Sequence, residues 1–116
     1  MHKLNFVYIL YMEREIITQA RNYIKNGDLI ALQTCGKSAT NRAVNIHYIF
    51  QMLFNCVCRY GTPEMLIWLV QVYYEFDVVN QIALRQLFFY GKVLTQKNNL
   101  IETSWFNDHI LILVRT

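Results

Sequence analysis

The chain has 116 residues, of which 54% are hydrophobic and 16% charged, and its net charge is +3. This length accommodates one core and this composition excludes an intrinsically disordered chain, so we expect residues 1–116 to form a single domain. The positive charge is mild and scattered, whereas nucleic-acid binders usually carry a clustered basic stripe, so binding to nucleic acid is disfavoured.

The first third of the chain predicts two helices. The apolar run at residues 4–12 is compatible with a strand or a helix, and we favour a helix. Apolar side chains then recur at helical spacing from residue 13 to residue 26. Gly27 is expected in the left-handed conformation that ends this helix, and a short second helix begins at Leu29. The polar interval at residues 34–41 predicts a loop.

A sharp turn then joins two apolar helices. The first of them, at residues 46–57, has one wide apolar side. We expect Gly61 to end it, the Thr62 hydroxyl to cap the next helix, and Pro63 to occupy the first helical position. That next helix is apolar nearly all round to about residue 74, so it requires neighbours on two sides. The expected core includes Phe50, Leu53, Trp68 and Leu69, with Trp68 buried between layers.

The last third predicts one more helix and an undecided end. Residues 82–89 have helical spacing up to a stop at Gly91, and residues 97–99 predict a loop. The β-prone run at residues 110–114 fits a last helix or a terminal strand equally well. The predicted fold class is therefore all-α, a short stack of helix-turn-helix units with terminal strands as an option.

Glycines close helical patterns at nearly regular intervals, which points to a repeat. The separations of Gly27, Gly61 and Gly91 are close to the ankyrin period of about 33 residues. Residues 56–70 resemble the ankyrin passage from the first helix, through its glycine turn, into the second helix. Residues 22–32 and 87–94 are fainter copies. The chain thus resembles the degenerate ankyrin-repeat proteins of large DNA viruses, such as the asfarvirus multigene families and the poxviruses.

This resemblance implies helical units near residues 13–41, 42–80 and 81–105, and a role in binding host proteins. The chain departs from the family pattern, because the usual Thr-Pro-Leu-His start is absent from all three units and Thr62-Pro63 falls on the other helix. The alternative is an ordinary small helical bundle whose turns require glycine.

The sequence predicts no nucleotide site, although one motif invites the question. Gly36, Lys37 and Ser38 match the end of a phosphate-binding loop, but Ala31 stands where the first glycine of that motif belongs. The backbone could therefore not readily wrap a phosphate. A protein that binds nucleotides through Gly36-Lys37-Ser38 remains an alternative.

The cysteines predict neither a metal site nor a disulfide. Cys35, Cys56 and Cys58 are odd in number and lack the spacing of a disulfide framework, which favours reduced thiols in the cytoplasm. Two of them are separated by one residue in a predicted helix, so their thiols point in different directions. With His47 they do not make a zinc-binding set or a catalytic pair, and we expect no cofactor, no metal and no catalytic residue.

We expect a non-enzymatic protein–protein interaction module, with a small helical nucleic-acid-binding protein as the alternative from another class. No segment has the length and apolarity of a membrane helix, so no membrane contact is expected. Apolar residues crowd both ends, which predicts self-association as a homodimer unless the terminal segments pair with each other. These end residues are Phe6, Val7, Ile9 and Leu10 at the start and residues 110–114 at the finish.

Overall fold

A computed structural model describes residues 6–41, 45–74 and 81–114 as a helical protein. The helices are α1 (Phe6–Lys25), α2 (Leu29–Asn41), α3 (Ile46–Tyr60), α4 (Pro63–Tyr74), α5 (Gln81–Thr95) and α6 (Thr103–His109), followed by a short 3-10 helix, η1 (Leu111–Val114). The prediction of an all-α fold is confirmed. In the part of the chain that the structure describes there is no strand, and the β-prone C-terminal run forms η1.

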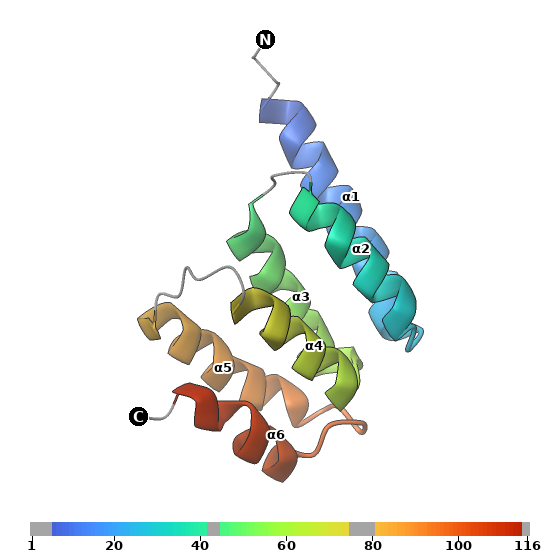
Figure 1. The fold of residues 1–116 in the computed structure, drawn as a ribbon. Helices are drawn as coiled ribbons and strands as arrows, with labels where there is room; N and C mark the ends of the chain where they lie inside the picture. Colours follow the sequence, from blue (N-terminus) through green and yellow to red (C-terminus); the bar gives the residue numbers. More distant parts are fainter. Residues whose placement is uncertain (1–5, 42–44, 75–80, 115–116) are drawn as a thin grey trace.

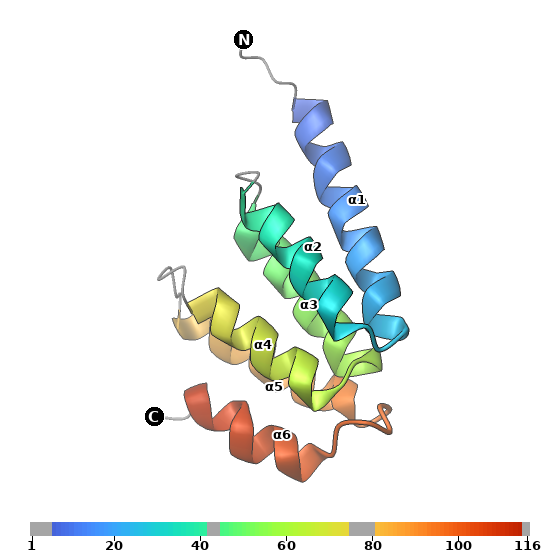
Figure 2. The same ribbon diagram turned by 45° about the vertical axis from the view of Figure 1, so that its right-hand side comes forward.

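The helices form two layers; neighbours within a layer run parallel, and successive helices run antiparallel in opposite layers (Figures 1 and 2). Helix α1 packs against α3 and α3 packs against α5, while α2, α4 and α6 lie together in front of them (Figures 1 and 2). Successive helices pair as α1 with α2, α3 with α4, and α5 with α6. The turns within these pairs lie along one edge of the molecule (Figure 2).

Local chemistry explains the first two of these turns. Gly27 has a φ of 73° and the N–H of Asp28 donates to the Tyr23 carbonyl, which is the hydrogen bond of a glycine-ended helix. Gly61 follows the last residue of α3 and its N–H donates to the Val57 carbonyl. The Thr62 hydroxyl accepts from the N–H of Met65 at 3.3 Å, and α4 begins at Pro63.

The expected loop at residues 34–41 is wrong, because these residues belong to α2. Residues 13 and 105, the outer limits expected for the first and third units, lie within α1 and α6. The limits expected between units, at residues 41/42 and 80/81, border residues 42–44 and 75–80, which are outside the described part of the chain.

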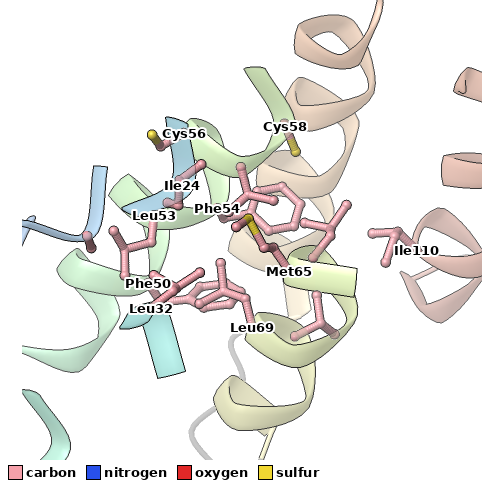
Figure 3. Packing of buried hydrophobic residues seen from close by; sticks show 14 of the residues in the cluster. Ile24, Leu32, Phe50, Leu53, Phe54, Cys56, Cys58, Met65, Leu69 and Ile110 are labelled. Carbon is pink, nitrogen blue, oxygen red and sulfur yellow. The ribbon is translucent and has the colours of Figure 1, made fainter. Parts of the chain in front are cut away.

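The core lies between the layers and is centred on Phe54 (Figure 3). This ring is 0% exposed, stacks on Phe88 with centroids 4.9 Å apart, and makes a T-shaped contact with Phe106 with centroids 6.4 Å apart. Phe50, Leu53 and Leu69 each remain only 4% exposed. Trp68 differs from the prediction because it is half-buried, at the edge of the core, where its ring lies over Gly36 of α2.

The expected helix stop at Gly91 is also wrong. Gly91 lies within α5 and is buried. A β-carbon there would lie 2.6 Å from Cε1 of Phe54 and 3.0 Å from Sγ of Cys58. The residue is a glycine because α3 and α5 approach closely at this point, and not because the chain turns.

We therefore predict that Gly91→Ala destabilises the protein even though alanine is the better helix former. Overpacking costs about 1–3 kcal/mol and the gain in helix propensity is about 1 kcal/mol, so we expect a net loss of up to about 2 kcal/mol in the free energy of unfolding. Urea denaturation measures it, with Gln86→Ala on the exposed side of α5 as the control. A stabilised Gly91→Ala variant would contradict the close approach.

Two polar side chains join neighbouring helix pairs. Asn98 is 8% exposed, and its amide Nδ2 donates to the carbonyls of Val57, Cys58 and Gly61 at 3.4, 3.0 and 3.1 Å. At the other end of α3, the carboxylate of Glu13 accepts from the backbone N–H of Asn45 at 3.1 Å. The ends of α3 are thus held by side chains from α1 and from the segment after α5.

Candidate functional site

A basic cleft lies between the C-terminal halves of α1 and α3. Its volume is about 320 Å³. Helix α1 contributes two cations one turn apart, and α3 contributes the floor and the far wall. The residues that line the basic cleft are Arg21, Lys25, Met52, Asn55, Cys56, Arg59 and Tyr60.

The charges of the basic cleft come from three exposed cations, Arg21, Lys25 and Arg59. Within the described residues, none of the three is in an ion pair with a carboxylate. The Nζ of Lys25 lies 4.8 Å from the centroid of the Tyr60 ring, a cation–π contact, and the Arg21 guanidinium is hydrogen-bonded to the Cys56 side chain. The cleft thus concentrates positive charge that the described part of the protein leaves available to a ligand.

These cations are not needed to cap their helices. Carbonyls in the last turn of α1 accept from the N–H groups of Gly27 and Asp28. At the end of α3, the Val57 carbonyl accepts from the Gly61 N–H, and the Asn98 amide serves the same turn. The favourable interaction of a cation with a helix C-terminus remains, but the carbonyl groups already have donors.

The floor of the basic cleft contains an unsatisfied acceptor. The Oδ1 of Asn55 is buried and has no hydrogen-bond partner among the described residues. A buried polar atom without a partner costs about 1–3 kcal/mol. Because this atom is closed to solvent, a ligand in the cleft could donate to it only after the Asn55 side chain turned toward the cleft.

A second cleft adjoins the first on the α5 side. It has a volume of about 360 Å³, shares Arg59 and Tyr60 with the basic cleft, and is completed by Val93, Leu94 and Lys97. One turn before Val93 of this cleft, on the same side of α5, two aromatic side chains are also exposed. They are Phe89 and Tyr90, which are 42% and 48% exposed, and Val93 itself is 55% exposed. We call this surface over α1, α3 and α5 the binding face.

The Cys56 thiol at the floor of the basic cleft is not set up as a nucleophile. Burial raises its pKa, and the nearby charges of Arg21, Lys25 and Arg59 lower it by less than burial raises it. Burial also raises the pKa of Cys58, which faces the core and not the cleft. His47 is exposed and lies about 13 Å from Cys56 along the axis of α3, at a rise of about 1.5 Å per residue.

The structure does not bring the predicted phosphate motif into a loop. Gly36 and Lys37 lie in the middle of α2, with Gly36 against the Trp68 ring, and Ser38 follows in the same helix. A helical backbone directs its N–H groups into its own hydrogen bonds, so this segment cannot cradle phosphates. Among the described residues, no three His, Cys, Asp or Glu side chains gather to hold a metal ion.

The comparisons with known proteins do not assign the site. No protein-family model, no curated protein and no solved structure matches the chain. In the part of the chain that the structure describes, no helix combines the length and the apolarity that crossing a bilayer requires.

Sequence reasoning missed the basic cleft, although it contains two partial signals. Arg21 and Lys25 are four residues apart, as are Asn55 and Arg59, so each pair shares a helix side. Neither pair is unusual by itself. The cleft exists because α1 packs beside α3, which no local pattern specifies.

Proposed function

We propose that the protein is a non-enzymatic protein–protein interaction module that uses the binding face. The observation that supports this most directly is the meeting of two clefts at Arg59 and Tyr60, beside exposed Phe89, Tyr90 and Val93. Aromatic residues and arginine are enriched in protein interfaces and dominate their binding energy. Soluble proteins rarely expose such groups together without a partner.

Selection of displayed random peptides on the immobilised protein tests this proposal. We expect peptides whose binding falls at least about tenfold with Tyr60→Ala or Phe89→Ala, because truncation of an interface aromatic commonly costs more than about 1.4 kcal/mol. Ile30→Ala is the matched control, because Ile30 is 77% exposed on α2, in the other layer. Peptides insensitive to both aromatic substitutions would contradict the assignment of the binding face.

The architecture we propose for this module is ankyrin-like, with a host protein as the partner of a viral chain in the cytoplasm. Three successive helix pairs in two layers support the repeat interpretation. The glycine turns at Gly27 and Gly61 support it further, whereas Gly91 does not, because it is not in a turn.

A small nucleic-acid-binding protein is the second candidate. It is favoured by Lys97 of the second cleft, which adds a fourth cation to the three of the basic cleft. Phosphate contacts would make its binding to an oligonucleotide fall steeply with salt. Weak binding with no such dependence would remove this candidate.

We also propose that the C-terminal end of the stack mediates a homodimer. Ile112 and Leu113 of η1 are 58% and 45% exposed. The side chains of Phe6, Val7, Ile9 and Leu10 are outside the described part of the chain. Helix α1 and η1 lie at opposite ends of the stack (Figure 1), so the described parts of the terminal segments do not pair.

Sedimentation at micromolar concentration tests the dimer. We expect twice the chain mass of 13.9 kDa for the unaltered protein and 13.9 kDa for the double variant Ile112→Glu, Leu113→Glu, because charges at the contact oppose association. Ile30→Glu on α2 is the control and should stay dimeric. A monomeric unaltered protein would refute the dimer.

A further inference from the structure

Three features of the basic cleft point to one kind of ligand. Arg21, Lys25 and Arg59 surround it from two helices and, among the described residues, are not paired with carboxylates. The Oδ1 of Asn55 at its floor lacks a donor. The adjoining cleft offers apolar contacts at Val93 and Leu94. A ligand that satisfies all three carries an anion, a hydrogen-bond donor and apolar groups close together.

We propose that the basic cleft binds an acidic side chain of an extended partner segment, with its carboxylate between Arg21 and Arg59 and a backbone N–H donating to Asn55 once the Asn55 side chain turns toward the cleft. This proposal rests on the proposed function and names the partner's chemistry. Charge complementarity supplies the specificity. A peptide can carry an anionic side chain, a backbone N–H donor and an apolar side chain within a few residues. The first two would bind in the basic cleft and the third in the adjoining cleft, which meets it at Arg59 and Tyr60.

A nucleic acid fits these features less well than an acidic peptide. Its phosphate oxygens are acceptors and cannot satisfy the Asn55 Oδ1, so a base or a ribose hydroxyl would have to supply the donor. The C-termini of α1 and α3 also lie beside the cations, and each carries a partial negative charge of about half a unit. These charges oppose a long polyanion more than a single carboxylate held between guanidinium groups.

Fluorescence anisotropy with a labelled peptide of alternating glutamate and leucine tests the proposal. We expect saturable binding of this peptide and at least about tenfold weaker binding of the same peptide with glutamine in place of glutamate. Each of Arg21→Gln, Lys25→Gln and Arg59→Gln should weaken binding by up to about fivefold, since exposed ion pairs have this magnitude. Arg14→Gln is the matched control, because it removes an exposed arginine of α1 outside the cleft.

The role of Asn55 has its own readout. Addition of the glutamate peptide should shift the side-chain amide resonances of Asn55 in a nitrogen–proton correlation spectrum. Asn55→Leu should weaken binding while leaving its salt dependence unchanged, because the cations remain. Unaltered Asn55 resonances at saturation would overturn its assignment as the acceptor.

Other results would overturn the acidic ligand. The first is the absence of saturable binding up to millimolar peptide. The second is that Arg14→Gln weakens binding as much as Arg21→Gln does. The third is that a random oligonucleotide binds more tightly than the glutamate peptide and is weakened by the substitutions in the cleft. Selected peptides without acidic residues that still depend on Tyr60 and Phe89 would refute this inference and keep the interaction module. If no selected peptide depended on residues of the binding face, both the acidic ligand and the proposed interaction module would be refuted.

Discussion

Phe54→Ala is expected to lower the free energy of unfolding by about 3–5 kcal/mol, the range for truncating a buried phenylalanine. The ring is 0% exposed and contacts Phe50, Phe88 and Phe106 from α3, α5 and α6. Its removal leaves a cavity where three helices meet, and aromatic pairs add to the loss. Urea denaturation followed by circular dichroism measures the change.

Two comparisons make this prediction specific. Phe89→Ala removes the same side chain from an exposed position of α5 and should change stability by less than about 1 kcal/mol. Gly91→Ala should cost less in the Phe54→Ala background, because the ring that its β-carbon would meet is gone. Phe54→Leu keeps the test usable if the alanine variant does not fold. Equal losses for Phe54→Ala and Phe89→Ala would contradict the described core.

The turns that could be predicted from sequence are those whose causes are local. Gly27 adopts a positive φ, and the Thr62 hydroxyl with Pro63 starts a helix, through contacts within a few residues. Gly91 shows the limit of this reasoning. Its cause is the Phe54 ring on another helix, so local sequence cannot distinguish a glycine required by close packing from one that ends a helix.

The same difference between local and tertiary causes explains which buried residues and which parts of the site follow from the sequence. Leu53 and Leu69 follow from helical periodicity and lie in the core. Trp68 has equally apolar neighbours in sequence, but its ring lies at the edge of the core, over Gly36 of α2, and stays half-buried. Predicting the basic cleft requires knowing that α1 and α3 are adjacent. Periodicity predicts which side of a helix faces the core, but it does not predict which helix packs against that side.

The second large effect is expected at Asn98, whose amide joins the segment after α5 to the end of α3. Its Nδ2 lies within 3.0–3.4 Å of the carbonyl oxygens of Val57, Cys58 and Gly61. Asn98→Asp replaces this donor with a buried carboxylate oxygen that faces carbonyl oxygens. We expect a loss of about 3–5 kcal/mol at pH 7, as for other buried charges left without a partner, and about 1–3 kcal/mol for Asn98→Ala.

The loss in Asn98→Asp should depend on pH, and the sign follows from the surroundings. Burial and three carbonyl dipoles raise the folded-state pKa of the introduced carboxyl above its unfolded value of about 3.9. Its protonated form can donate to one carbonyl, so the difference from the unaltered protein is smallest below about pH 4 and grows as the pH rises through the folded-state pKa. Denaturation of both proteins at matched pH measures this difference. Asn99→Asp makes the same charge change at the exposed neighbouring residue and should cost little at any pH. If Asn98→Asp were as mild as Asn99→Asp at pH 7, Asn98 would not hold the second and third helix pairs together.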